Sequence, residues 1–219
     1  GHLNTFLASM QAYYAGALGV AYVNIMYAPY LEGMSYGEMK QEAQHLIFSC
    51  SQSAFSRGGQ TLFLDFNVHT GIPRYLRNIP AIGPGGKPTG KTYGDYEETA
   101  RQFTLAMLDV FAFPKCDFHI NEDTLSDPKQ YEILEYACQI ASENGVPYFI
   151  FDRDEITLSA CCRLRTTIDD NYMIKHPESM RFCGFQNITI NLPQASYRAG
   201  RGNWDALHKE IDRGIEIAG

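Results

Sequence analysis

Two adjacent cysteines, Cys161 and Cys162, followed directly by Arg163, are the residues of this chain best suited to covalent or redox chemistry. Neighbouring cysteines seldom bridge each other, because a disulfide requires a particular Cα separation and torsion. One of the two thiols is therefore expected to act alone or with a distant partner. Arg163 and Arg165 favour a thiolate beside them. From these residues we predict an α/β enzyme with a reactive cysteine, while packing, a metal fragment and a redox couple remain alternatives.

Three weaker patterns accompany the cysteine pair. Asp117 and His119 alternate along KCDFHI, but two ligands alone do not predict a zinc site, which usually has four. The segment SRGGQT, residues 56–61, is either a helix C-terminal cap or a loop for an anion or substrate. Polar residues alternate along QNITINLP, and they serve either a core network or a substrate hydroxyl; they are Asn187, Thr189 and Asn191.

The composition predicts one large globular domain in a reducing cytoplasm. The 219 residues are 45% hydrophobic and 20% charged, and their net charge of −7 argues against binding a nucleic-acid polymer. We expect no membrane span and no signal peptide, because no apolar run is long enough and the start lacks a basic region. Six cysteines without a C-x-x-C motif argue against a four-cysteine zinc site. Cys138 lies in a helical pattern and is predicted to be buried.

Helices and strands are predicted to alternate along most of the chain. Helices are expected over residues 3–28, 35–56, 95–110 and 126–144 and from 203 onward, with a Ser35–Glu38 capping box. Strands are expected over 61–70, 111–120, 146–152 and 184–193, and a long surface loop over 71–94. In the first strand Leu64, Phe66 and Val68 face one way, and Asp65, Asn67 and His69 the other.

Strands with one polar and one apolar face predict an α/β barrel that holds a hydrophilic substrate. An open doubly wound sheet is the alternative. The chain has no G-x-G-x-x-G turn after a strand, which argues against a dinucleotide-binding fold.

The predicted helix to Val110 runs into the predicted strand from Phe111 with no turn residues between them. Connections between a helix and a strand usually take about 2–6 residues. We therefore expect a connecting loop at this junction that the printed sequence lacks.

Four segments, taken in order, resemble the anaerobic, oxygen-sensitive (class III) ribonucleotide reductases of the glycyl-radical branch. They are SRGGQTLFLDFN (56–67), FAFPKCDFHI (111–120), SACCRLRT (159–166) and MRFCGFQNITINLPQASYRA (180–199). The resemblance implies a ten-stranded α/β barrel, present here in part and as a single domain over residues 1–219. It implies the reduction of ribonucleoside triphosphates to deoxyribonucleoside triphosphates under anaerobic conditions.

The resemblance also implies roles for particular residues. Cys162 corresponds to the radical cysteine, and Cys183 stands where the formate-using branch has asparagine, so it is predicted to be a second redox thiol or else a buried structural cysteine. Both are predicted to be catalytic. The predicted substrate-binding residues are Arg163, Asn187, Asn191, Ser56, Gly58 and Gln60.

The family's partners are expected to follow the resemblance: ATP and deoxynucleotide effectors, a radical-SAM iron–sulfur activase, a redoxin or formate as reductant, and a second subunit in a homodimer. The family's glycyl radical, C-terminal zinc site and N-terminal cone domain are expected outside this chain, so no cofactor is expected on this segment and the segment alone is predicted to be inactive. Alternatives are a nucleotide-binding barrel fragment without activity and a non-radical thiol oxidoreductase.

Overall fold

The computed structural model describes residues 1–13, 16–52, 62–111, 114–153, 157–160, 164–167 and 188–218. Contacts divide the chain into two units, Gly1–Met180 and Arg181–Gly219. The prediction that residues 1–219 form a single domain stays a prediction.

The centre of the first unit is a four-stranded parallel sheet in the order β1-β2-β5-β6. Its strands are β1 (Leu18–Val20), β2 (Leu64–His69), β5 (Lys115–Ile120) and β6 (Tyr148–Phe151). All three pairings are parallel, with Phe66 beside Cys116 and His119 beside Ile150. The predicted α/β class is confirmed by this sheet and the helices between its strands.

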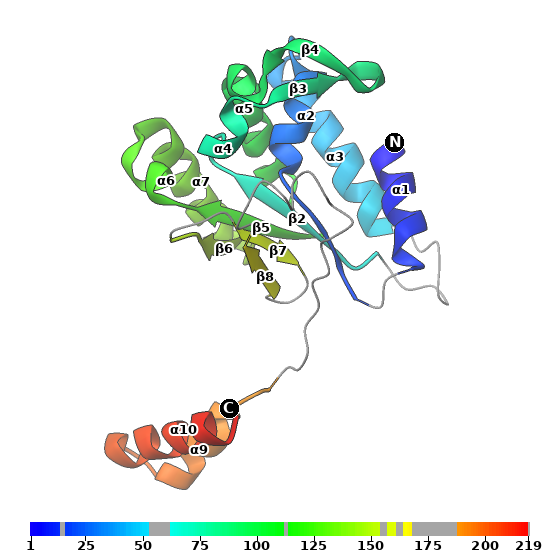
Figure 1. The fold of residues 1–219 in the computed structure, drawn as a ribbon. Helices are drawn as coiled ribbons and strands as arrows, with labels where there is room; N and C mark the ends of the chain where they lie inside the picture. Colours follow the sequence, from blue (N-terminus) through cyan, green and yellow to red (C-terminus); the bar gives the residue numbers. More distant parts are fainter. Residues whose placement is uncertain are drawn as a thin grey trace. The chain divides into compact units, whose positions relative to one another are not determined.

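One face of the sheet is apolar and is covered by helices. The helices are α1 (His2–Gln11), α2 (Val23–Leu31), α3 (Tyr36–Gln52), α5 (Glu97–Leu108) and α7 (Pro128–Asn144). Phe66 and Phe118, both fully buried, belong to the two clusters that join the sheet to these helices. Burial of each such side chain contributes about 1.5–3 kcal/mol. Figure 1 shows α2, α3 and α5 on one side of the sheet and the β7–β8 hairpin on the other.

The hairpin on the opposite face consists of β7 (Thr157–Ala160) and β8 (Leu164–Thr167), which pair antiparallel. β7 packs against β1 and β2. Residues 161–163, which connect the two strands in the chain, lie outside the described residues. The cysteine pair is therefore bounded on both sides by described strands.

Two expectations for the amino-terminal half are wrong. The apolar stretch expected as one helix over residues 3–28 is α1, β1 and α2, because Leu18–Val20 pairs with β2 as an edge strand. The segment 71–94, expected as a loop, holds α4 (Arg74–Arg77), β3 (Pro80–Gly83) and β4 (Lys87–Thr92), followed by the 3-10 turn η2 (Tyr93–Tyr96). Pro84, Gly85 and Gly86 form the 3-10 turn between the two strands of this antiparallel hairpin.

The capping residues predicted from the sequence begin α3, and they begin and end α7, as expected. Ser35 Oγ and backbone N–H both donate to Glu38 at 2.8 Å, so the predicted capping box at the start of α3 is confirmed. Asp127 caps α7, where Pro128 is the first residue, and Gly145 ends it with a φ of 79°. Cys138, however, lies exposed on α7, so the prediction that it is buried is wrong; Ile133 and Ala137 form the face that contacts the core.

The junction of α5 and β5 contains its own connection. α5 ends at Leu108 and β5 begins at Lys115, so six residues, 109–114, link them. The predicted strand start at Phe111 is wrong. The expectation of a loop missing from the printed sequence rested on that start, and six residues are enough to connect a helix to a strand.

The second unit is described over residues 188–218. It contains α9 (Leu192–Ala199) and α10 (Trp204–Ala218), which pack against each other and share an ion pair between Arg198 and Glu210 at 3.6 Å. The strand expected over 184–193 is not formed at residues 188–191, and Asn191 instead caps α9. None of the described helices has the length and apolar character that crossing a bilayer requires.

Candidate functional site: the polar face of the sheet

The face of the sheet opposite the helices carries polar side chains from two neighbouring strands. Asp65, Asn67 and His69 come from β2. Lys115, Asp117 and His119 come from β5, and the register places them beside the first three in the same order. The predicted alternation of β2 is confirmed, and both of its faces are buried. Buried polar groups usually have hydrogen-bond partners, so the contacts of these six side chains describe what this face can do.

One cation lies between two acidic side chains at the amino-terminal end of this face. The Lys115 ammonium lies 2.6 Å from Asp117 Oδ1 and 3.8 Å from Asp65 Oδ1. It also lies over the Tyr148 ring, 5.3 Å from the centroid. The two buried acidic side chains thus share one cationic partner.

His119 forms the centre of the network at the other end. Its Nδ1 lies 2.8 Å from Asp152 Oδ2, and its Nε2 lies 2.8 Å from Asn67 Oδ1. The amide orientation of Asn67 is fixed by Ser159, whose backbone N–H donates to Oδ1 at 2.8 Å. His119 Nε2 must therefore donate to the same oxygen. Its Nδ1 then faces the Asp152 carboxyl group at hydrogen-bond distance, so both ring nitrogens of His119 have partners.

His69 is buried beside this pair and is held by its backbone. Asn24 Nδ2 donates to His69 O at 2.8 Å, and Thr104 Oγ1 donates to the same carbonyl at 3.2 Å. The rings of His69 and His119 stack 4.5 Å apart at 15°. Burial, with the nearby His119, holds the pKa of His69 well below its usual value. His69 is therefore a neutral imidazole at pH 7.

His69, His119 and Asp152 bring their ligand atoms within 4.8 Å of one another, as a metal site would. The ring geometry argues against a shared ion. A metal binds imidazole nitrogen along a lone pair in the ring plane, and the planes of these two rings are nearly parallel and stacked. His119 also uses both nitrogens in hydrogen bonds. Asp117, the other half of the pair considered from sequence, contacts Lys115 instead.

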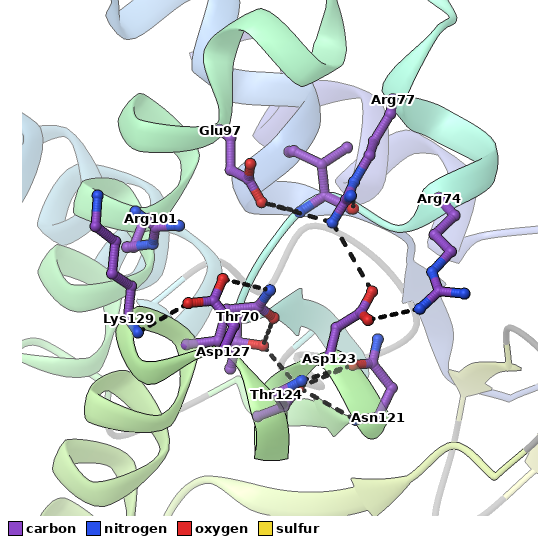
Figure 2. Close-up of polar contacts among 12 residues, drawn as sticks. Thr70, Arg74, Arg77, Glu97, Arg101, Asn121, Asp123, Thr124, Asp127 and Lys129 are labelled. Atoms are coloured by element: carbon purple, nitrogen blue, oxygen red, sulfur yellow. Dashed lines mark hydrogen bonds and ion pairs between the residues drawn. The ribbon is translucent and has the colours of Figure 1, made fainter.

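A second polar cluster lies where β2 and β5 end (Figure 2). Thr70 Oγ1 lies 2.8 Å from Thr124 Oγ1 and donates to Gln130 Oε1 at 2.8 Å. Arg74 donates to Asp123 Oδ1 at 2.9 Å, and Arg77 lies 3.8 Å from Asp123 Oδ2. Arg77 also lies 4.0 Å from Glu97. Ligands of α/β proteins with parallel sheets usually bind at the carboxyl ends of the strands. At this edge, however, Arg74 and Arg77 already form ion pairs with the carboxylates of Asp123 and Glu97. The cluster joins α4, α5 and α6 (Glu122–Ser126) at the edge of the sheet.

Most residues predicted from sequence to form the site lie outside the described residues: Ser56, Gly58, Gln60, Cys162, Arg163, Cys183 and Asn187. Asn191 is described and exposed, and its Oδ1 accepts from Gln194 N–H at 2.9 Å. Its predicted contact with substrate stays a prediction. The structure brings together residues that were not selected as site residues, above all Asn67, His69 and Asp152. The polar alternation along residues 65–69 was the sequence signal for the first two.

The first unit is thus an α/β fold. Helices cover the apolar face of its parallel sheet, and a hairpin covers the buried charged side chains on the other face. The family described as anaerobic ribonucleoside-triphosphate reductase matches residues 1–219, the whole chain. The chain belongs to this family, whose described activity is that of an oxidoreductase acting on ribonucleoside triphosphates. A search of the curated proteins gave no significant match.

Proposed function

We propose that this chain is part of the catalytic barrel of an enzyme that reduces ribonucleoside triphosphates to 2′-deoxyribonucleoside triphosphates under anaerobic conditions, with Cys162 as the radical-bearing residue. The observation that carries the proposal is the family match over all 219 residues. The Cys-Arg pair agrees with it in chemistry, and the strands on either side of that pair belong to a hairpin on the polar face of the sheet.

The four parallel strands are, in this proposal, an arc of a ten-stranded barrel. Two features of the described residues support it. Helices pack on the apolar face, as they do outside an α/β barrel, and the opposite face carries the charged and amide side chains expected of an interior that binds a hydrophilic ligand. A doubly wound sheet has helices on both faces.

The proposed reaction begins when the Cys162 thiyl radical takes the hydrogen atom from the ribose 3′ carbon, forming the S–H bond. The 2′ hydroxyl then accepts a proton and leaves as water. Two electrons and a further proton from the reductant replace it with hydrogen, and the 3′ hydrogen returns from Cys162. The sum is ribonucleotide, two electrons and two protons giving deoxyribonucleotide and water. A redoxin dithiol ends as a disulfide, and formate ends as carbon dioxide.

Binding of the nucleotide is assigned in this proposal to Arg163, Asn187, Asn191, Ser56, Gly58 and Gln60. A site that hydrogen-bonds sugar hydroxyls discriminates strongly, because an analogue without them leaves its polar groups unpaired. Nucleotide effectors, an iron–sulfur activase and a second subunit act with the complete enzyme. The activase supplies the radical, and this segment on its own is proposed to be inactive.

The test is a pair of neighbouring substitutions in the enzyme that carries this segment, activated and supplied with reductant. Cys162→Ala is expected to lower deoxynucleotide formation by more than about 10³-fold, because no other group replaces a nucleophile or radical carrier that acts in every turnover. The dissociation constant of the nucleotide should change less than threefold. Cys161→Ala is the matched control and should keep most activity.

Turnover by Cys162→Ala within tenfold of wild type would overturn the assignment. An enzyme that binds nucleotide and forms no deoxynucleotide under any activation would instead be a binding module. Activity without an activase would favour a non-radical thiol oxidoreductase.

A further inference from the structure

The side-chain amide of Asn67 uses every hydrogen-bonding position that it has. Its Nδ2 donates to Ser159 O at 2.8 Å and to Val20 O at 3.3 Å. Its Oδ1 accepts from Ser159 N–H at 2.8 Å and from His119 Nε2 at 2.8 Å. An asparagine amide has two N–H donors and two acceptor sites, so the set is complete. Asn67 and Ser159 are both 1% exposed.

Two of these bonds join Asn67 to both backbone groups of a single residue, Ser159. The amide thereby does for β7 what a neighbouring strand does in a sheet: it satisfies one N–H and one C=O. The other two bonds tie the amide to β1 and β5, whose positions the parallel sheet fixes. A single side chain therefore holds β7 to the sheet at one defined residue.

The held residue is close in sequence to the reactive pair. Ser159 precedes Cys161 by two residues and Cys162 by three, and β7 ends at Ala160. Three residues span at most about 11 Å even when fully extended, so only a short piece of chain separates the held residue from the reactive pair. A hydrogen abstraction requires the reacting atoms within about 3–3.5 Å, and an error of 1 Å is costly.

We propose that Asn67 is a positioning residue for the reductase reaction: its amide fixes Ser159, and with it the end of β7 from which the chain continues to the reactive cysteine pair. This inference rests on the proposed function for its catalytic consequence. The contact with Ser159 itself does not depend on that function.

The chemistry of the amide defines which variants are informative. Asn67→Asp keeps the shape and both acceptor sites but loses the two donors, so carboxylate oxygen faces the carbonyls of Ser159 and Val20. Asn67→Ser removes the contact while leaving room for water, which makes it the milder change for folding. Asn78→Asp is the matched control, because Asn78 is exposed in the same unit.

The first measurement is amide hydrogen exchange of the enzyme that carries this segment, resolved to the peptide containing Ser159. Loss of the Asn67 acceptor should speed exchange of the Ser159 N–H by at least tenfold in Asn67→Ser, and Asn78→Asp should leave it unchanged. Unchanged exchange in Asn67→Ser would overturn the contact and with it the inference.

The second measurement separates kcat from KM in the activated enzyme. Both Asn67 variants should lower kcat by at least tenfold, with KM within threefold and the radical content after activation unchanged. A merely structural role would instead lower folded protein and radical content in parallel with kcat. A kcat within threefold of wild type in a variant with fast Ser159 exchange would overturn the positioning role.

The Cys162→Ala and Asn67 variants together distinguish a failure of the proposed function from a failure of this inference. If Cys162→Ala stays active, the reaction does not use that thiol and the catalytic part of the inference is overturned too. If Cys162→Ala is inactive and the Asn67 variants keep full kcat, the inference alone is wrong.

Discussion

Asp109 is the residue that joins three helices of the first unit. Its Oδ2 accepts from Lys40 at 2.7 Å and from Tyr36 at 3.0 Å, both on α3, and its Oδ1 accepts from Tyr136 of α7 at 2.5 Å. Burial by itself would raise the pKa of Asp109. The hydrogen bonds from Lys40, Tyr136 and Tyr36 outweigh it, and the pKa lies below its ordinary value.

We expect Asp109→Asn to lower the free energy of unfolding by about 1–3 kcal/mol at pH 7, because hydrogen bonds to a charged acceptor are lost. A depressed folded-state pKa stabilises the protein above the unfolded pKa of about 3.9 and loses that effect as pH falls through the folded value. The difference between wild type and variant should therefore shrink below about pH 4. Urea unfolding at pH 7 and pH 3 measures both.

Glu32→Gln is the control, since Glu32 forms a half-exposed ion pair with Lys91. Exposed pairs contribute little, so no measurable loss of stability is expected there. An Asp109→Asn difference that grows toward acid pH would contradict the role assigned to the carboxylate.

Among the elements, η2 and α4 approach each other so closely that a side chain does not fit between them. A Cβ added at Gly94 would lie 2.8 Å from the backbone carbonyl oxygen of Arg77. Backbone cannot rotate away as a flexible side chain does. The missing side chain at Gly94 therefore sets the distance between these two short elements, which pack with α2 around Ile72 and Tyr93.

Gly94→Ala is expected to lower the free energy of unfolding by about 1–3 kcal/mol, the usual cost of overpacking. Gly37→Ala is the matched control, because Gly37 lies in α3 with open space around its missing Cβ. In a helix this change usually adds about 0.5–1 kcal/mol of stability. Thermal unfolding of both variants checks the pair, and equal effects would refute the argument from close approach.

For the whole molecule, a prediction concerns the reductant that the proposed reaction requires. We expect Cys183→Ser to lose multiple turnover with a thioredoxin-type reductant while retaining about one product per activated site, since a thiol must be regenerated by disulfide exchange. Product counted over time at limiting enzyme measures this.

Cys138→Ser is the control for this prediction, because that thiol is exposed on α7 and has no assigned role. Full turnover with formate as the only reductant would count against a redox role for Cys183 and would leave the buried structural alternative.

Patterns local in the chain were enough to predict several elements. The Ser35–Glu38 box, the Asp127–Pro128 start and the Gly145 end determine α3 and α7 through hydrogen bonds within a few residues. The alternation from Leu64 to His69 likewise determined which side of β2 is polar, because a strand turns successive side chains to opposite faces. Four sequence segments, taken in order, carried the family resemblance, which the family match confirms.

Only the tertiary structure decided between secondary structures and hydrogen-bond partners that the local sequence patterns could not distinguish. Leu18–Val20 reads as part of a helix until β2 supplies its parallel hydrogen bonds, and the strand expected through Asn191 is a helix cap there. The partners of Asn67 are 47, 52 and 92 residues away in the chain. A polar residue in sequence shows that it needs partners, but their identity depends on which strands lie side by side, and that is fixed by packing of the whole unit.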